Sequence, residues 1–464
     1  MSRSTIVTDQ LAHERMIFEQ LPVPKAVAAM VVPTIVSQII SVVYNLADTW
    51  FVGLTGNAGA VAAISLCLPV YTMMSAFSNL FGIGGSSMIA RAVGMKEINN
   101  ARTDFSISFW AALVTAAVYS LFILIFARPF LLLIGGDSSS IDYAVSYVYI
   151  TIVIGGIPTI LASTFAHLIR SAGESKAASS GMMIGAVLNI VLDPLFMFVL
   201  LPSGFEVIGA AIATTVSNTV SLIYFICYLN KHHDGTFFDI SPRLLKRSRR
   251  IFWKIIKCGL PSFALVGMAM ISNFFLNGMI GSGVDGSAVA GMGIVRKIDS
   301  LAYAVNQGIT QGMLPIVAYC YASGRIQRMK SVVLFCSVCT VGFSLVCSII
   351  SYLFAPVLIS VFIKDASTIA YGAKFLRIMC ISVSLYPITF VVITLFQSVG
   401  QSVKPFILSL LHKGSFDILL LFIIRSLYGA ENIVWAAPVM DAVALTSAVL
   451  MAFTLFRKLN RSSY

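Results

Sequence analysis

The stretch PTIVSQIISVVYNLADTWFVG (residues 33–53) is mostly apolar, and a similar stretch, PSFALVGMAMISNFFLNGMIG (261–281), follows at an offset of 228 residues. Three pairs of identical residues coincide at this offset: Pro33 with Pro261, Asn45 with Asn273, and Gly53 with Gly281. A helix of about 20 apolar residues is long enough to span a bilayer. The chain therefore contains a membrane-spanning unit that is written twice.

The composition of the whole chain is that of a membrane protein. Of its 464 residues, 58% are hydrophobic and 11% are charged, and the mean hydropathy is +0.91. Soluble domains carry roughly 25% charged residues. We count about twelve apolar windows that are long enough to span a membrane. They are residues 26–54, 58–90, 105–127, 143–169, 178–201, 207–230, 254–283, 286–321, 331–357, 370–396, 404–428 and 432–456.

The repeat and the windows together predict the architecture. Half of the windows fall in each copy, and an even number of spans makes both copies enter the membrane in the same sense. Parallel repeats of this kind build transporters with a central cavity. We therefore expect an all-α polytopic membrane protein with about twelve transmembrane helices in two lobes of six. Its predicted parts are an N-terminal segment (1–25), an N-lobe (26–230), a basic linker (231–253), a C-lobe (254–456) and a C-terminal tail (457–464).

The net charge of +12 is unevenly distributed among the predicted loops. Lysine and arginine concentrate in the N-terminal segment, the linker and the tail, which places these parts in the cytoplasm by the positive-inside rule. We expect a multi-pass protein of the bacterial cytoplasmic (inner) membrane with both termini inside. The basic run SPRLLKRSRRIFWKIIK (241–257) suits contact with anionic membrane lipids. No nucleic-acid-binding module accompanies it, so nucleic acid is not an expected partner.

Several chemistries lack their sequence motifs. No GxxxxGK[ST] occurs, so we expect an ion gradient to drive transport and no cofactor besides the coupling ion. GIGGSS (82–87) lacks the lysine of a phosphate loop and lies in an apolar window, which favours close helix packing. No HExxH or Ser/His arrangement suggests an enzyme. The eight cysteines lack metal-ligand spacing and are best interpreted as small core residues. One chain holds both lobes, so we expect a functional monomer.

Polar side chains gather at one depth in the predicted N-lobe. Asp48 lies in the first window, Asn189 and Asp193 in the fifth, and Thr214 in the sixth. The rise of an α-helix places these residues about 10 Å from the outer membrane surface. Carboxylate, amide and hydroxyl oxygens suit a proton or a hard cation such as sodium. The sequence predicts a proton or sodium site here, and the alternative is a structural network that locks three helices together.

The surroundings of the two acids favour the functional interpretation. Pro194 cannot donate a backbone hydrogen bond, which leaves the Ile190 carbonyl as a further oxygen for the site. The acids have leucine counterparts in the second copy: Leu276 for Asp48, and Leu420 or Leu421 for Asp193. A structural need shared by both copies would not place acids at these positions in one copy alone. The acids therefore indicate a function that is confined to the first lobe.

Charged residues in the predicted C-lobe leave two interpretations open. Arg296 and Asp299 are three residues apart, and Lys413 and Asp417 are four apart, so each pair shares one face of a helix. They either line the cavity and tune the charge of the substrate or form ion pairs between helices. Asp441 is equally open. Three further side chains are candidates for the cavity lining, or else belong to ordinary helix surface: Asn45, Met73 and Phe77.

These motifs resemble those of the multidrug and toxic compound extrusion (MATE) family. The matching segments are PTIVSQIISVVYNLADTWFVG (33–53), GIGGSSMIARAVG (82–94), LNIVLDPLF (188–196), GAAIAT (209–214), AGMGIVRKID (290–299) and QGMLPIVAY (311–319). The resemblance covers nearly the whole chain. It implies two six-helix lobes around a V-shaped cavity. It also implies export of amphipathic, often cationic organic compounds in exchange for protons or sodium ions.

The resemblance implies roles for single residues. The first-lobe cation site of the family, for a proton or sodium, falls on Asp48, Asn189, Asp193 and Thr214. Tyr44, one turn before Asp48, matches a neighbouring polar position, and Pro33 matches the hinge proline at which the first helix is proposed to bend. One branch of the family relies on a glutamate in helix 7 and an aspartate in helix 10. This sequence lacks both and is more similar to the DinF-like and bacterial drug-efflux branches.

An alternative function is that of a lipid-linked oligosaccharide flippase, which is a distant relative of the same superfamily. Such proteins carry several basic residues that face the cavity and meet a pyrophosphate. In this sequence Arg296 and Lys297 are the only obvious candidates, whereas acids dominate the first lobe. The sequence therefore favours the antiporter over the flippase.

Overall fold

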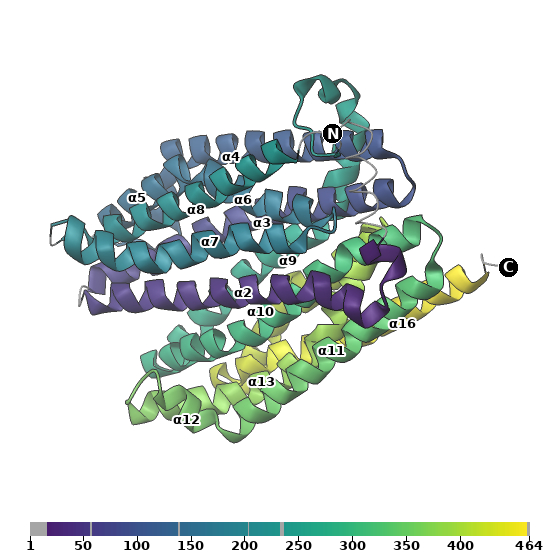
Figure 1. Ribbon diagram of the computed structural model, residues 1–464. Helices are drawn as coiled ribbons and strands as arrows, with labels where there is room; N and C mark the ends of the chain where they lie inside the picture. Colours follow the sequence, from purple (N-terminus) through teal and green to yellow (C-terminus); the bar gives the residue numbers. More distant parts are fainter. Residues whose placement is uncertain (1–15, 56–57, 138–139, 203, 233–235, 462–464) are drawn as a thin grey trace. The chain divides into compact units, whose positions relative to one another are not determined.

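The computed structural model describes residues 16–55, 58–137, 140–202, 204–232 and 236–461. Residues 1–15 of the predicted N-terminal segment, 233–235 of the linker and 462–464 of the tail lie outside these ranges. Every regular element in the described part of the chain is helical (Figure 1). The predicted all-α class is therefore confirmed.

The elements follow the predicted windows closely. In the first half they are η1 (Met16–Gln20), α2 (Val23–Leu54), α3 (Ala58–Gly94), α4 (Ile98–Leu133), α5 (Ile141–Val148), η2 (Tyr149–Ile154), α6 (Gly156–Arg170), α7 (Ser175–Pro194), η3 (Leu195–Leu200) and α8 (Glu206–Lys231). In the second half they are η4 (Pro242–Arg247), α9 (Ser248–Gly283), α10 (Gly286–Ala322), α11 (Ile326–Leu353), α12 (Ala355–Ser360), α13 (Ala366–Ser398), α14 (Val403–Lys413), α15 (Ser415–Tyr428), η5 (Ala430–Trp435) and α16 (Ala436–Arg461).

In the described part of the chain, the helices that are long and apolar enough to span a membrane number one or two fewer than the twelve predicted windows. Among the described residues, 10 helices are long and apolar enough to cross a membrane, and the bent pair α5–α6 raises this to 11. The remaining window corresponds to α10, which has 37 residues but carries Arg296, Lys297 and Asp299. These charges lower the apolar character of a helix that is otherwise long enough to span.

The chain forms two compact units. The first unit contains the described residues up to Leu21 and the segment Val36–Gly259, and the second contains Pro22–Ile35 and the chain from Leu260 onward. The helices α2 and α9 are therefore each divided between the units, although each is continuous. This division, which rests on contacts between residues, does not coincide with the lobe boundaries predicted at the 231–253 linker. Those boundaries stay predictions.

Glycines let α3 and α9 touch backbone to backbone inside the first unit. A Cβ atom on Gly84 would lie 2.4 Å from the carbonyl oxygen of Ile255, and one on Gly259 would lie 1.8 Å from that of Leu80. Small residues allow such close approach between membrane helices. Because Gly84 belongs to the GIGGSS stretch, the predicted role of this stretch in helix packing is confirmed.

The bend between α5 and α6 is stabilised by side chains from neighbouring helices. The two helices meet at 52° after the π-helical turn η2. The Thr215 hydroxyl of α8 donates to the Ile150 carbonyl at 3.1 Å, and the Ser120 hydroxyl of α4 donates to the Ile152 carbonyl at 2.7 Å. These hydroxyls add side-chain hydrogen bonds to two carbonyls that also accept from the Gly155 N–H, and so they link the irregular turn to α8 and α4.

The core of the second unit is organised around α13. This helix packs against α10, α11 and α16. Its buried aromatic residues include Phe375, Tyr386, Phe390 and Phe396. Because α13 is covered on several faces, it forms a fixed support for the polar residues on α10, α14 and α16.

Candidate cation site and a polar cavity in the second unit

Asn189 and Asp193 lie one turn apart near the end of α7. Both side chains are buried, at 2% and 0% exposure, although one is polar and the other ionisable. The Asn189 Nδ2 donates to Asp193 Oδ1 at 3.2 Å. After Pro194 the α-helix changes into the π-helix η3. Such π-helical turns are frequent at functional sites, and here the proline removes the hydrogen bond that would continue the α-helix.

Thr214 on α8 completes the link between two helices. The Asn189 Nδ2 lies 3.4 Å from the Thr214 Oγ1, and the Thr214 side chain is buried. The amide thus holds the hydroxyl of α8 and the carboxylate of α7 at the same time. The structure brings together these three residues, which the sequence analysis placed at one depth.

Asp48 on α2 reaches the same cluster from a third helix. It is half-buried, and it lies close enough to Asp193 for the two charges to act on each other. Within the described part of the chain, three buried oxygens of the cluster have no hydrogen-bond partner: Asp48 Oδ1, Asn189 Oδ1 and Asp193 Oδ2. Unsatisfied oxygens are costly inside a membrane protein. Their number and chemistry fit a proton or a sodium ion as the missing partner.

Around the cluster lie Tyr44, which the sequence analysis named as a neighbouring position, and two residues that it did not name, Tyr71 and Asn218. Tyr44 lies within range of the charges of Asp48 and Asp193, and Tyr71 of α3 lies against Tyr44. Asn218, one turn after Thr214, lies against Tyr71 and donates to Thr159 Oγ1 at 2.9 Å. The spacing of Thr214 and Asn218 on one helix face could have indicated Asn218. Nothing in the sequence indicated Tyr71.

Two other residues predicted for the first lobe, Asn45 and Phe77, have contacts outside this cluster. Asn45 is exposed, and its amide donates to the Ser41 carbonyl of its own helix at 2.7 Å. Met73 and Phe77 on α3 are half-buried, and the Phe77 ring packs on Tyr119 at a centroid distance of 5.3 Å. Their predicted role in the cavity lining stays a prediction.

Pro33 belongs to a different unit from the acids. It lies in the Pro22–Ile35 segment of α2, which packs with the second unit, whereas Asp48 belongs to the first unit. The predicted hinge thus lies within three residues of the point at which α2 passes from one unit to the other. Its bending stays a prediction.

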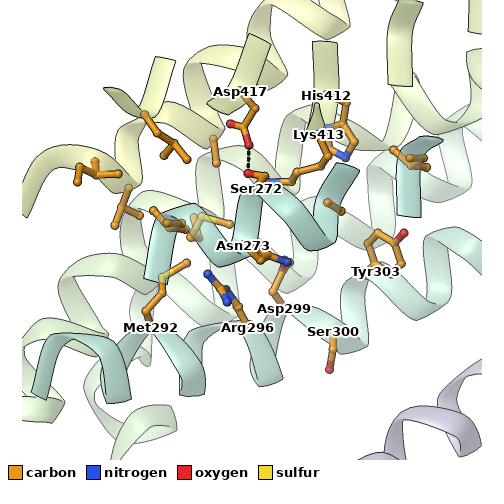
Figure 2. A pocket seen from close by; sticks show the side chains of 18 residues that line it. Ser272, Asn273, Met292, Arg296, Asp299, Ser300, Tyr303, His412, Lys413 and Asp417 are labelled. Carbon is orange, nitrogen blue, oxygen red and sulfur yellow. Dashed lines mark hydrogen bonds between the residues drawn. The ribbon is translucent and has the colours of Figure 1, made fainter. Parts of the chain in front are cut away.

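The second unit contains a cavity of about 250 Å³. Four of the residues left open by the sequence analysis line it: Arg296, Asp299, Lys413 and Asp417. Figure 2 shows these side chains around Ser272 and Asn273 of α9. The cavity thus gathers charges from two spans that are far apart in the sequence, α10 and α14–α15, beside polar groups of a third, α9.

The partners of these charges differ from the ion pairs that were one expectation. Asp417 accepts a hydrogen bond from the Ser272 hydroxyl rather than pairing with Lys413. Among the described residues, Arg296 and Asp299 form no ion pair within 4.0 Å, and Arg296 Nη2 and Asp299 Oδ1 are buried without a hydrogen-bond partner. The i,i+3 and i,i+4 spacings therefore predicted which charged residues share a helix face, but these residues do not form ion pairs with each other.

His412 is the polar residue of this region that the sequence analysis missed. It is buried, and its Nδ1 donates to Asp441 Oδ1, while the Ser382 hydroxyl donates to Asp441 Oδ2. The rings of Tyr386 and Phe390 pack beside the imidazole, at centroid distances of 5.7 and 5.0 Å. Asp441, whose role was open, is therefore the partner of a buried histidine.

The helix that supplies Lys413 and Asp417 is broken between them. α14 ends at Lys413, Gly414 is extended, and α15 begins at Ser415. A Cβ atom on Gly414 would lie 2.5 Å from the carbonyl oxygen of Leu410, so this position requires glycine. The break places Lys413 at a helix C-terminus and Asp417 at a helix N-terminus, where each charge is favoured by the helix dipole.

Comparison with known proteins decides the family. A family model described as MatE matches residues 33–195 and 258–423, with one match in each half of the chain. The chain belongs to the MATE family. The double match also agrees with the internal repeat and assigns the chain to a family of transporters, not of enzymes.

Individual relatives of this MATE protein cover almost its whole length. The multidrug export protein MepA of Staphylococcus saprophyticus is 27% identical over 440 residues, which are 94% of this chain and 95% of that protein. MepA of Staphylococcus aureus is 26% identical over 440 residues, with the same coverage.

Solved structures confirm the fold. The crystal structure of MATE in complex with MaL6 superposes with a TM-score of 0.89 at 23% identity and covers 97% of this chain and 99% of that one. The outward-facing conformation of a multidrug resistance MATE family transporter of the MOP superfamily gives a TM-score of 0.88 at 23% identity, with 96% and 98% covered. The fold of two lobes is therefore that of MATE transporters, and the chain is a multi-pass membrane protein.

Proposed function

We propose that this MATE protein exports amphipathic, often cationic organic compounds in exchange for protons or sodium ions, by alternating access across the bacterial cytoplasmic membrane. The relatives named multidrug export proteins support the substrate class. The observation that carries the proposal is the set of unpartnered oxygens on Asp48, Asn189 and Asp193, within the described residues of the first unit. We further propose a monomer, with membrane lipids around it and both termini in the cytoplasm.

The geometry suggests how the coupling ion reaches its site. Asp48 keeps part of its surface exposed, whereas Asp193 is fully buried and lies within range of the Asp48 charge. An entering cation or proton therefore meets Asp48 first and neutralises the pair, which responds as one coupled unit. Sodium would use the free oxygens of Asp48, Asn189 and Asp193 together with the Thr214 hydroxyl, since hard cations take oxygen ligands.

Neutralisation of the acids provides the coupling between ion and substrate. A charged pair attracts a cationic substrate, and a neutral pair does not. Bending of α2 at Pro33, where a backbone hydrogen bond is already missing, then reduces the space in the first lobe. Each ligand shifts the balance between the two states only through its different affinity for them, so ion and substrate exchange rather than move together.

An imposed gradient tests the proposal. Everted membrane vesicles that contain the protein should accumulate a cationic dye when a pH gradient or a sodium gradient is applied. We expect one of the two gradients to suffice, with uptake lost when an ionophore collapses it. Vesicles without the protein serve as the control. Accumulation that requires ATP and ignores both gradients would contradict the proposal.

Binding of a permanently charged cation should depend on pH if protons are the coupling ion. In detergent without sodium, affinity should fall as the pH is lowered from about 8 to about 5, because protonation removes the negative charge of the pair. The Asp193→Asn variant should bind weakly at every pH, since it mimics the neutral form. Titration calorimetry measures both. Affinity that stays constant over this range in the wild type would instead favour displacement by sodium.

A further inference from the structure

The internal repeat relates three of the four first-lobe site residues to residues that line the cavity of the second unit. The offset of 228 carries Asp48 to Leu276, Asn189 to Asp417 and Asp193 to Leu421, and an offset of 227 carries Thr214 to Asp441. All four counterparts are buried, as Asn189, Asp193 and Thr214 are. In the second unit, leucines thus stand at the positions of Asp48 and Asp193. Aspartates stand at the positions of Asn189 and Thr214.

The acids at these exchanged positions are already satisfied. Asp417 accepts from Ser272, and Asp441 accepts from His412 and Ser382. The second unit therefore does not repeat the free carboxylates of the first. Among the buried atoms of the second unit that have no hydrogen-bond partner, in the described part of the chain, two belong to charged side chains of α10: Arg296 Nη2 and Asp299 Oδ1.

One nitrogen of the Arg296 guanidinium, Nη2, has no hydrogen-bond partner in the described part of the chain, although the charge of Asp299 acts on the group. A charged group at membrane depth is costly unless it meets a partner. The guanidinium of Arg296 is a planar donor that matches a carboxylate in a bidentate geometry. Lys413 lies on the same cavity and within range of the Asp299 charge, so it supplies a second cation. The cavity thus presents two cations beside the carboxylates of Asp299 and Asp417, and the free Nη2 of Arg296 is the donor that the carboxylate of a ligand would meet.

The size and the lining of the cavity suit one end of an amphipathic molecule. Its volume of about 250 Å³ is slightly below that of typical ligand pockets, so it accommodates a charged arm rather than a large drug. Leu265, Leu276, Met292 and Leu421 provide apolar walls. Arg296, Asp299 and Lys413 each keep part of their surface exposed, so the cavity is not sealed.

We propose that this cavity is a second ligand site, in which Arg296 binds the carboxylate of an anionic or zwitterionic amphipath. Lys413 adds attraction for the carboxylate, and Asp299 Oδ1 accepts a hydrogen bond from an N–H group of the ligand where it has one. The site lies entirely in the second unit and does not depend on cation coupling in the first. It would extend the ligands of this transporter beyond organic cations.

A pair of probes that differ only in the carboxylate tests the proposal. Carboxybutyl-triphenylphosphonium carries a fixed cation and a carboxylate on a flexible arm, and its methyl ester lacks the negative charge. Titration calorimetry of the full chain in detergent at neutral pH should show the carboxylate binding about 10-fold more tightly than the ester. The Arg296→Gln variant should lose this preference, so that the two probes bind with similar affinities.

Matched variants separate recognition from a general effect of charge or folding. Lys297→Gln removes the neighbouring cation of α10, which does not line the cavity, and should keep the preference. Arg296→Lys retains the positive charge but lacks the planar guanidinium group, so it should keep part of the preference for the carboxylate. This variant also tests the proposal if Arg296→Gln does not fold. Equal affinity of the wild type for both probes would overturn the proposal, as would an equal loss in Arg296→Gln and Lys297→Gln.

A further variant distinguishes a failure of the second ligand site from a failure of the proposed ion-coupled export. Asp193→Asn removes a first-lobe charge that attracts the phosphonium, but it leaves the cavity of the second unit unchanged, so the carboxylate probe should still bind more tightly than the ester. Loss of this preference in Asp193→Asn would place carboxylate recognition in the first unit instead.

Discussion

Efflux should be abolished at normal expression when either Asp48 or Asp193 is replaced by asparagine. Asparagine keeps the shape of the side chain but can neither take up a proton nor offer a negative charge. The loss should therefore reach the background rate of cells without the protein. Dye efflux from energised cells measures it, and the amount of protein in the membrane fraction shows that each variant is produced.

Asp417→Asn is the matched control for these variants. Asp417 is buried in the second unit, as Asp193 is in the first, and the substitution is the same. Its carboxylate already accepts from the Ser272 hydroxyl, and the oxygen of asparagine can accept that bond. We expect at least partial activity. An inactive Asp417→Asn beside an active Asp193→Asn would move the coupling site to the second lobe.

Removal of Asp441 should strongly destabilise the second unit. The Asp441→Leu variant leaves the buried imidazole of His412 and the hydroxyl of Ser382 without an acceptor. Leaving a buried polar group without its hydrogen-bond partner typically costs about 1–3 kcal/mol for each group. We expect a much lower melting temperature in detergent, or no folded protein. The double variant His412→Leu with Asp441→Leu should recover much of the loss, because apolar replacement of the whole pair is often neutral.

The ion pair of Arg128 with Asp142 is the control for this effect. Its atoms are 3.0 Å apart, but the two side chains are 61% and 76% exposed. Exposed pairs contribute at most about 1 kcal/mol, so Asp142→Ala should change the melting temperature little. If Asp441→Leu melted like Asp142→Ala, the His412–Asp441 pair would not support the unit.

Much of the fold could be predicted because hydropathy and repetition act along the sequence. Every predicted window contains a helix, and the offset between Pro33 and Pro261 already indicated two copies. The bend at η2 and the break at Gly414 were not predicted. A hydropathy window records how apolar a segment is, whereas bends depend on backbone geometry and on hydroxyls such as Thr215 from another helix.

The candidate site was predictable to a similar extent. Counting depth along helices placed Asp48, Asn189, Asp193 and Thr214 together, because a straight helix converts residue number into depth. The role of His412 was missed, since its partner Asp441 lies on another helix, 29 residues away. Depth gives one coordinate only, and the partner of a side chain depends on how helices are rotated against each other.

The division of α2 and α9 between the two units has a consequence for the order of assembly during synthesis. The first unit includes Ser248–Gly259 of α9, so it cannot be complete when its own six spans have left the ribosome. The second unit includes Pro22–Ile35, which was made long before the rest of it. Each unit can therefore complete its folding only after a segment from the other half of the chain is present. A chain cut in the 231–253 linker would yield two fragments that are each incomplete and can mature only by finding one another in the membrane.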